Sequence, residues 1–289
     1  MVTGGSGRAG GYIIADLLKH GYDAVNADIT PPRPDSPGVR ASEKTGKAVR
    51  FLRTDTTDFG EVTAALKGAD AVIHMSAIPS PVSVPEHRVF AINMLSDWNV
   101  LEAAEVHGIR KVVKASSINA VGAVFSHGIV ETEYLPIDED HPTRAEDGYS
   151  QSKWLGEEMS EAFCRRRDMQ IASMRFHGLW DRARQKEFRK TGDKTTVTGR
   201  QAMHFWGWVD ISEAARATVL ALEKDWTGHE AFFINATDTT LEIPTEEALA
   251  EAYPRSPLRS ALPGFTSPIR IEKAREVLGW ETNVSWRDA

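Results

Sequence analysis

Tyr149 and Lys153 are four residues apart in the chain, so on a helix their side chains lie on one face. A free tyrosine has a pKa of about 10 and is a poor base at neutral pH. A nearby ammonium favours the phenolate and lowers that pKa toward the range that general acid–base catalysis needs. Ser117 could hydrogen-bond the same substrate oxygen and stabilise charge that develops on it. A Tyr and a Lys at this spacing are also common neighbours on exposed helices, so the interpretation depends on the rest of the chain.

A second informative stretch is the glycine-rich segment at the start of the sequence. Gly4, Gly7 and Gly10 suit a tight turn, close approach to a pyrophosphate, and close helix–strand packing. The helix that follows would point free N–H groups at the phosphates. Asp28 ends the next strand, 18 residues past Gly10, where a carboxylate can bind the adenosine ribose hydroxyls; a plain turn role is the alternative. The stretch predicts a dinucleotide site, whose nicotinamide would exchange a hydride beside Tyr149.

Further along, two segments could line this site. Asp55 could reach an adenine amino group, or it could simply cap a turn. The small residues of segment 76–81 would let a dinucleotide pass across the sheet edge. His74 has no second metal-type ligand nearby, so we interpret it as a core histidine and predict no metal site.

Strands and helices alternate along the chain, which is typical of an α/β fold with a Rossmann-type doubly wound parallel sheet. The expected strands are 23–27, 48–52, 70–75, 111–115, 170–175 and 231–234. The expected helices are 8–20, 59–67, 93–106, 149–167, 211–223, 244–252 and 272–278. Residues 30–47 are expected to form a polar loop, and 180–200 show little periodicity. Only Met1 and Val2 precede Thr3, so either the chain starts further upstream or the central strand is short.

We expect a Rossmann domain at 1–175, with 209–235 returning to it. Residues 176–208 and 236–289 would form a small C-terminal substrate lobe. A chain of 289 residues can bury a substantial core, and its net charge of −7 gives no general attraction for nucleic acid or membrane. Cys164 is the only cysteine and lies in an apolar helical pattern, where a small buried hydrophobe is favoured over a nucleophile. With no signal or membrane-spanning segment in the sequence, a cytoplasmic protein is expected.

These motifs occur in the order found in one family. The relevant residues are Thr3-Gly4-x-x-Gly7-x-x-Gly10, Asp28, Asp55, Asn93, Leu101-Glu102-Ala103-Ala104, Ser116-Ser117, Tyr149-x-x-x-Lys153 and the tail from Leu278-Gly279-Trp280 to Ser285-Trp286-Arg287-Asp288. In combination they resemble extended short-chain dehydrogenases/reductases of the NAD-dependent epimerase/dehydratase family.

The resemblance implies NAD as cofactor and gives each catalytic residue a role. Tyr149 would be the acid/base, and Lys153 would bind the nicotinamide ribose and lower the tyrosine pKa. Ser117 would orient the substrate oxygen, and Asp28 would favour NAD over NADP. The resemblance also implies a homodimer formed through helices 93–106 and 149–167. The cofactor-binding residues that we expect are Gly4, Gly7, Arg8, Ala9, Gly10, Asp28, Asp55, Thr56, Ser76, Ala77, Ile78, Asn93, Ala115, Tyr149 and Lys153.

One departure bears on the substrate. Only 26 residues separate Leu179 from Trp206, where nucleotide-sugar epimerases of this family carry a longer insertion. In this respect the lobe resembles uronate dehydrogenases. We therefore expect an NAD-dependent oxidoreductase acting on a secondary alcohol or ketone of a small sugar or sugar acid. The alternative is a nucleotide-sugar epimerase or dehydratase similar to UDP-glucose 4-epimerase, and a third is a non-catalytic NAD-binding regulator.

Substrate contacts are expected at the carboxyl edge of the sheet and in the lobe. The candidates are Ser80, Ser117, Ile118, Asn119, His177, Gly178, Arg184 and Trp206. Trp206, Trp208 and His204 could form an aromatic wall for a sugar, or the tryptophans could pack the lobe against the domain. Arg184 or Arg182 could bind a carboxylate, whereas Arg175 is placed for a buried ion pair.

Overall fold

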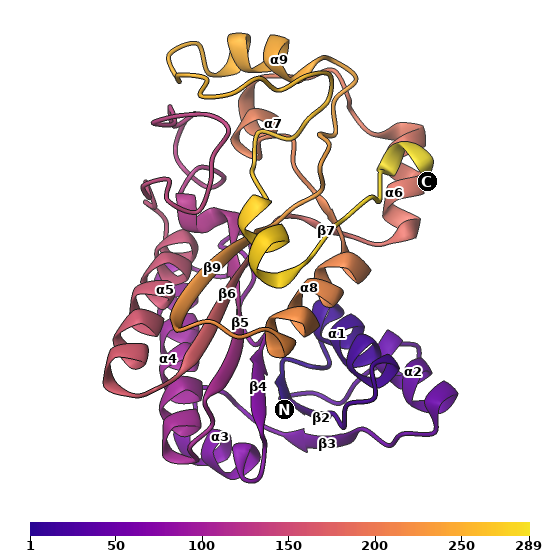
Figure 1. Cartoon of the computed structure of the whole chain (residues 1–289), viewed down its shortest axis with the longest axis vertical. Helices are drawn as coiled ribbons and strands as arrows, with labels where there is room; N and C mark the ends of the chain where they lie inside the picture. Colours follow the sequence, from indigo (N-terminus) through magenta and orange to yellow (C-terminus); the bar gives the residue numbers. More distant parts are fainter.

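The computed structural model describes residues 1–289 and is built around one seven-stranded parallel sheet (Figure 1). The strands lie in the order β3-β2-β1-β4-β5-β6-β9, so the chain reverses direction across the sheet between β1 and β4. This order confirms the doubly wound Rossmann-type fold. The strand bounds are β1 Val2–Thr3, β2 Val25–Asp28, β3 Arg50–Arg53, β4 Ala71–His74, β5 Lys111–Ser117, β6 Gln170–Phe176 and β9 Gly228–Ile234.

Helices cover both faces of the sheet (Figure 1). On one face lie α3 (Phe59–Leu66), α4 (Glu86–Val106) and α5 (Gly148–Arg166). On the other lie α1 (Arg8–Lys19), α2 (Pro37–Thr45) and α8 (Ile211–Glu223). None of the helices is both long and apolar enough to cross a bilayer.

The central strand β1 consists of two residues, Val2 and Thr3. Val2 pairs with Asn26 of β2 and with Ile73 of β4, so even this short strand is hydrogen-bonded on both sides. Directly after it, the N–H of Gly4 donates to the Ala27 carbonyl at 2.8 Å. The glycine-rich turn therefore starts directly at the end of the central strand and is held to β2 by this hydrogen bond.

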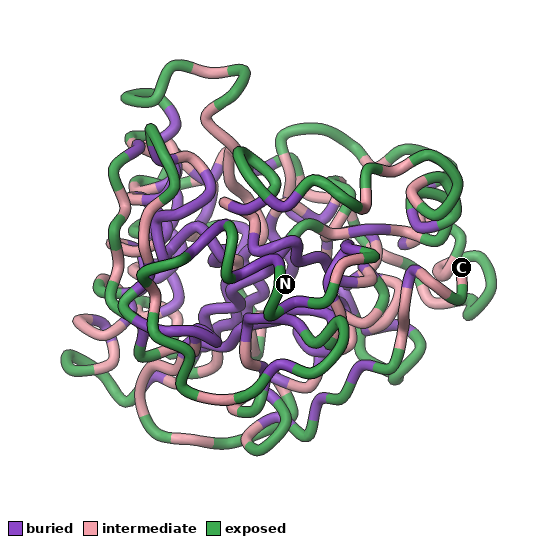
Figure 2. The backbone as a smooth tube through the Cα atoms, turned by 90° about the horizontal axis from the view of Figure 1, so that it is seen from above, coloured by how far each residue is buried: buried purple, intermediate pink, exposed green.

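The remaining elements form a lobe over the carboxyl edge of the strands (Figure 1). They are η1 (Ile118–Val121), β7 (Leu179–Trp180), α6 (Arg182–Thr191), α7 (Gly199–Met203), β8 (Val209–Asp210), α9 (Thr245–Ala252) and η3 (Trp286–Asp288). The π-helical turn η2 (Ala274–Leu278) packs instead on α8 and β9 of the main domain. One apolar cluster joins residues 197–206 and 241–269 to the segment 118–137 that follows β5. Figure 2 shows the buried residues gathered at the centre of the molecule and the exposed loops at its rim.

Three stretches differ from the sequence-based expectation. Residues 30–47 contain α2, which starts at Pro37 and packs so closely on α1 that Gly38 lies against Ile14. Helix α4 begins at Glu86, seven residues before the predicted start; of residues 86–92 only Val89 is buried, so no apolar period marks these first two turns. The stretch 180–200 contains α6, whose first turn is capped by the Asp181 carboxylate at the Arg184 N–H.

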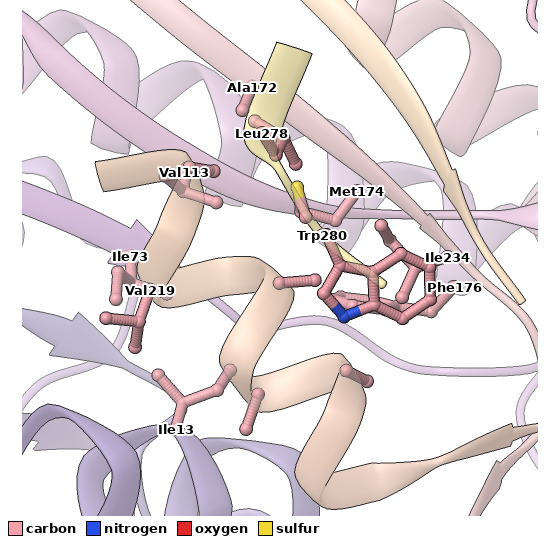
Figure 3. Close-up of a cluster of buried hydrophobic side chains, with 14 of the residues drawn as sticks. Ile13, Ile73, Val113, Ala172, Met174, Phe176, Val219, Ile234, Leu278 and Trp280 are labelled. Atoms are coloured by element: carbon pink, nitrogen blue, oxygen red, sulfur yellow. The ribbon is translucent and has the colours of Figure 1, made fainter. Parts of the chain in front are cut away.

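The C-terminal tail returns to the main core rather than staying in the lobe. Leu278 and Trp280 are buried with Met174 of β6 and with residues of α8, as Figure 3 shows. The Trp280 indole N–H donates to the Glu213 carbonyl at 3.0 Å, which ties the tail to α8. The segment 236–289, which we expected in the lobe, therefore contributes to the packing of both parts of the chain.

Replacing Gly10 tests the packing of the glycine-rich turn. A Cβ at this position would lie 2.2 Å from the Gly4 carbonyl oxygen and 2.7 Å from the Gly5 Cα, and backbone atoms cannot move aside cheaply. We expect Gly10→Ala to reduce the free energy of unfolding by about 1–3 kcal/mol in chemical denaturation. Gly128→Ala is the matched control, because nothing lies within 4 Å of its Cβ. Equal stabilities of the two variants would contradict this packing.

Candidate active site

Two adjoining hollows lie along the carboxyl edge of the strands. An outer hollow of about 260 Å³ is lined by Gly4, Gly7, Asp28, Ile29, Thr54, Asp55, Thr56, Thr57, Met75, Ser76, Ala77, Ile78, Ile92 and Ser96. An inner hollow of about 360 Å³ is lined from below by the catalytic candidates and from above by the lobe. Because Met75 and Ala77 line both, the two form one groove that starts at the glycine-rich turn and ends at Tyr149.

The glycine-rich turn forms the floor of the outer hollow. Gly4 adopts φ +67°, and a Cβ there would lie 2.7 Å from the Ser76 backbone nitrogen. Gly7 faces the hollow, and a Cβ at this position would meet only the Gly4 carbonyl oxygen, at 3.1 Å. Arg8 and Ala9 begin α1 and line the inner hollow, so the amino end of the helix points into the groove. This cradle fits a pyrophosphate, since free N–H groups at a helix start bind anions.

Asp28 also lines the outer hollow. Its carboxylate accepts the N–H of Ser6 at 3.1 Å and the N–H of Thr30 at 3.2 Å. These bonds fix the carboxylate at the end of β2 beside the glycine-rich turn. The position is the one in which an acidic side chain can accept hydrogen bonds from ribose hydroxyls.

Asp55 lines the same hollow but has a turn role in the structure. One carboxylate oxygen accepts the Thr57 hydroxyl at 2.7 Å and the Thr57 N–H at 2.9 Å. These hydrogen bonds lower the pKa of Asp55. Thr56 is fixed from behind by α4, because Ser96 donates to its hydroxyl and Asn99 to its carbonyl.

Asn93 acts behind the groove rather than in it. Its side-chain oxygen accepts the Ile78 N–H at 2.8 Å, and its amide donates to the Ile78 carbonyl at 3.1 Å. The same amide also donates to the Ser152 hydroxyl on α5. Asn93 therefore orients the segment 76–78, which lines the groove, and the expectation that it contacts the cofactor itself is not met by the geometry.

Helix α5 places Tyr149 and Lys153 on its inward face. The Asp147 carboxylate caps the helix by accepting the N–H groups of Tyr149 and Ser150, each at 2.9 Å. The Lys153 ammonium donates to the Ala115 carbonyl of β5 at 2.9 Å and lies 5.7 Å from the centre of the Tyr149 ring. Both side chains are buried and line the inner hollow, as the four-residue spacing predicted.

The protonation of Tyr149 differs from the sequence-based expectation. Burial raises the pKa of Tyr149 to about 12, while the Ser117 side chain acts in the opposite direction. The Lys153 ammonium, which donates to the Ala115 carbonyl, is not among the groups that shift this pKa in the protein alone. Burial also lowers the pKa of Lys153, against the opposing effects of the Asp97 and Glu157 carboxylates. In the protein alone, Tyr149 is therefore a phenol near neutral pH.

Ser117 ends β5 beside Tyr149. Its oxygen accepts the Asn119 N–H at 3.1 Å and the Asn119 side-chain amide at 2.9 Å. With both lone pairs used, the Ser117 hydroxyl hydrogen has to donate elsewhere. Ser117 is thus oriented as a donor at the floor of the inner hollow, which is the role needed to stabilise negative charge on an oxygen.

The predicted substrate residues fall into two groups. Ser117, Ile118, Asn119, His177 and Gly178 line the inner hollow. Ser80, Arg184 and Trp206 do not line it, and these predictions are corrected. Pro79, not Ser80, reaches the hollow; the Arg184 guanidinium lies on the outer surface, 5.1 Å from the Trp180 ring; and Trp206 is 1% exposed in the lobe cluster.

Sequence reasoning missed Val124, Phe125 and the lining role of Leu179. Phe125 packs edge-on against the Tyr149 ring, with centroids 5.8 Å apart. Both Val124 and Phe125 belong to a segment without regular structure, so no periodicity marked them. The apolar run of residues 121–125, which begins four residues after Ser117, is the signal that could have found them.

His177 closes the lobe side of the hollow in a neutral form. Its Nδ1 accepts the Gly178 N–H at 2.6 Å, so Nε2 carries the proton and donates to the His204 carbonyl at 2.8 Å. Burial lowers the pKa of His177 to about 3. His177 is therefore not the acid/base near neutral pH. Instead, its Nε2–H holds the backbone carbonyl of His204, whose ring also lines the hollow.

Below the site, Arg175 forms the expected buried ion pair. Its guanidinium binds the Glu157 carboxylate, with the shortest contact at 2.7 Å, and Glu157 also accepts the Ser116 hydroxyl. Burial acts to raise the pKa of Glu157, but Arg175 and Ser116 keep it below its usual value. Arg175 of β6 therefore holds α5 through Glu157 and does not line the inner hollow.

Comparison with known proteins agrees with this geometry. The model of the family described as NAD dependent epimerase/dehydratase matches residues 1–234, and the chain belongs to this family, whose cofactor is NAD. Human UDP-glucose 4-epimerase is 31% identical over 176 residues, which are 57% of this chain and 48% of the human protein. The Bacillus subtilis UDP-glucose 4-epimerase is 31% identical over 164 residues, 55% of this chain and 46% of that protein. The matches thus span about half the length of these relatives.

Solved structures match over a larger part of the chain. UDP-glucose 4-epimerase from Stenotrophomonas maltophila, with bound NAD and formylated UDP-arabinopyranose, has a TM-score of 0.72 at 20% identity and covers 99% of this chain and 94% of that one. The Thermus thermophilus UDP-glucose 4-epimerase complex with NAD has a TM-score of 0.69 at 24% identity, with 99% and 96% covered. At these identities the likeness concerns the fold.

The neutral state of His177 makes a prediction about pH. Because its folded pKa of about 3 is below the ordinary 6.5, the unfolded chain binds the proton more readily. The resulting stability is present above about 6.5 and is lost as the pH falls toward 3. We expect wild type to lose stability relative to His177→Gln, on the order of a few kcal/mol, as the pH falls from about 6.5 toward 3, because glutamine does not titrate.

Chemical denaturation at several pH values measures this difference. Other buried histidines contribute equally to both proteins, so the comparison isolates His177. His127→Gln is the control, since His127 is exposed. A stability difference that stays constant over the whole pH range would show that His177 is not neutralised by burial.

Proposed function

We propose that the protein is an NAD-dependent enzyme that oxidises a secondary alcohol of a nucleotide sugar and reduces the resulting ketone in place, as an epimerase does. The observation that carries the proposal is the convergence of Tyr149, Lys153 and Ser117 on one hollow continuous with the glycine-rich turn. The curated relatives are named UDP-glucose 4-epimerases, which supports this alternative over the sugar-acid oxidoreductase that the sequence favoured.

The proposed chemistry is a coupled transfer of a proton and a hydride. Bound NAD would supply the acceptor for the hydride that leaves the carbinol carbon. Ser117 donates a hydrogen bond to the substrate oxygen, and Tyr149 takes up or returns the hydroxyl proton. As a phenol, Tyr149 is ready to protonate a ketone oxygen. For the oxidation its pKa has to fall from about 12, and Lys153 is the nearby cation that can favour the phenolate.

The residues already described would each bind a different part of the cofactor. The turn at Gly4, Gly7 and Gly10 would bind the pyrophosphate, and Asp28 the adenosine ribose. We propose that Asp28 favours NAD over NADP, because a fixed carboxylate repels a phosphate on the ribose. Lys153 would reach the nicotinamide ribose from below.

Dehydrogenation of a free sugar or sugar acid is the second candidate. The segment between Leu179 and Trp206 has 26 residues and contains only the short helices α6 and α7 besides β7. A compact segment leaves less chain to bind a nucleotide, which favours a smaller substrate. A non-catalytic NAD-binding regulator is disfavoured, because it would have no use for a buried Tyr149, Lys153 and Ser117.

We also propose a cytoplasmic homodimer. Leu95 and Trp98 on α4 are 46% and 40% exposed, and this helix packs beside α5, so the two helices present an apolar surface to a second copy. Cys164 is a free thiol, which fits a reducing compartment. The proposed domain division remains 1–175 with 209–235 for NAD and 176–208 with 236–289 for substrate; the tail residues Leu278 and Trp280 pack in the former.

Incubation with UDP-glucose, UDP-galactose, free sugars and sugar acids in the presence of NAD tests the proposal. An epimerase converts one UDP-sugar into the other with no net change in NADH absorbance. Stoichiometric NADH with a free sugar or sugar acid would instead establish the second candidate. NAD binding without turnover on any sugar would favour the regulator.

Tyr149→Phe tests the catalytic role of the phenol. Removing the proton donor should lower kcat by about 100- to 10,000-fold, the usual size of a general acid–base contribution, and leave NAD binding unchanged. Tyr22→Phe is the matched control, because Tyr22 is exposed at the amino end of β2. A Tyr149→Phe enzyme as active as the Tyr22→Phe enzyme would rule out the mechanism.

A further inference from the structure

Helix α4 carries polar residues on the face that it buries. Asn93, Ser96, Asp97 and Asn99 are all buried there. Three of them hold residues that line the cofactor groove: Asn93 orients Ile78, and Ser96 and Asn99 fix Thr56. The fourth, Asp97, is the only charged member of this set, and its partners lie in another direction.

Asp97 joins two strands to the catalytic helix. One carboxylate oxygen lies 3.1 Å from Nε2 of His74 on β4, and the other contacts the Lys114 ammonium on β5. The Lys114 ammonium, on a residue that is 2% exposed, also donates to the Gly156 carbonyl of α5 at 2.9 Å. A buried ion pair thus binds the backbone of α5 one turn after Lys153.

On its other side the same network reaches the glycine-rich turn. Nδ1 of His74 lies 2.6 Å from the hydroxyl of Thr3, the residue before Gly4. Burial lowers the pKa of His74, so the ring is neutral, with Nε2–H donating to Asp97 and Nδ1 accepting from Thr3. A continuous set of hydrogen bonds therefore connects the start of the phosphate-binding turn with the catalytic helix.

The room for this ion pair is made by a glycine. A Cβ on Gly156 would lie 2.3 Å from an Asp97 oxygen and 2.8 Å from the Lys114 ammonium. Any larger residue would push α5 away from β5, and with it Tyr149 and Lys153. The missing side chain at Gly156 thus lets α5 accommodate the buried Asp97–Lys114 pair.

Lys153 is surrounded by charged and titratable groups from every element packed against it. They are Asp97 on α4, His74 on β4, Lys114 on β5, Tyr149 and Glu157 on α5, and Arg175 on β6. Glu157 is already neutralised by Arg175. Of the carboxylates, Asp97 has the larger effect in keeping Lys153 charged against its burial.

We propose that Asp97, paired with Lys114, is a positioning residue for the catalytic lysine. Its buried negative charge keeps Lys153 protonated, and through Lys114 it fixes α5 at Gly156 so that Lys153 stays beneath the groove. The effect of Asp97 on the protonation of Lys153 is a property of the protein without bound NAD or substrate. Only the catalytic meaning of that charge rests on the proposed function.

Titration of Lys153 in the free protein tests this proposal. Isotope-labelled lysines are followed by NMR against pH, and the Lys153 signal is the one absent from Lys153→Met. In Asp97→Asn the midpoint should fall by about one pH unit, because a nearby opposite charge is removed. Glu105→Gln is the matched control: Glu105 also lies on α4 and pairs with α5 through Arg166, but at the carboxyl ends of both helices, away from Lys153. Its midpoint should equal that of wild type.

Lys114→Met provides an independent second arm with the opposite sign. It removes a repelling ammonium and frees the Asp97 carboxylate, so the Lys153 midpoint should rise. Thermal unfolding establishes which variants fold; if Asp97→Asn does not fold, Lys114→Met decides alone. A Lys114→Met midpoint at or below the wild-type value, or a folded Asp97→Asn protein with an unchanged midpoint, overturns the proposal. Neither measurement needs substrate or NAD, so a wrong assignment of the reaction would leave the result valid.

Discussion

The hydrogen bond from Lys153 to the Ala115 carbonyl fixes the distance between the catalytic helix and the central sheet. Helix α5 can approach β5 this closely because Gly156 has no side chain and because Asp147 caps its first turn. Once α5 is in place, Tyr149 faces Ser117 at the end of β5, and both face the groove from the glycine-rich turn. The order of the parallel strands then brings residues more than a hundred positions apart in sequence into one site.

Much of the site is held by buried polar groups, and this has consequences for rigidity. Glu157 is paired with Arg175, Asp97 with Lys114, and Asn93 with both polar groups of the Ile78 backbone. Such groups are costly to bury unless every partner is present, so each network specifies one arrangement of its helices and strands. The result is a floor of fixed geometry beneath a lobe that is held together by a buried apolar cluster.

The sequence allowed the prediction of those features that follow from local spacing. The glycine-rich turn, Asp28 at the end of β2, and Tyr149 and Lys153 on one helix face depend on residues close together in the chain, and the structure places them as expected. Features set by tertiary packing were missed. The early start of α4 was hidden because only Val89 of its first seven residues is buried. The tail around Trp280 packs in the main core through apolar contacts with β6 and α8, which lie far away in the sequence.

The same limit explains the errors at the site. Trp206 looked like a sugar platform because tryptophan stacks well on sugars, yet its ring is covered by Tyr253 and other lobe residues. The predicted effect of Lys153 on Tyr149 assumed only the four-residue spacing. In the folded protein, burial has the largest effect on the tyrosine pKa and raises it, which the spacing alone does not reveal.

The central claim is that Tyr149, Ser117 and Lys153 form one catalytic group at the inner end of an NAD-binding groove. A crystal structure of the NAD complex tests this most directly. The account predicts the nicotinamide ring in the inner hollow beside the Tyr149 hydroxyl, with the Lys153 ammonium about 3 Å from a ribose hydroxyl. A nicotinamide bound outside that hollow, or a Tyr149 hydroxyl turned away from the ring, would contradict it.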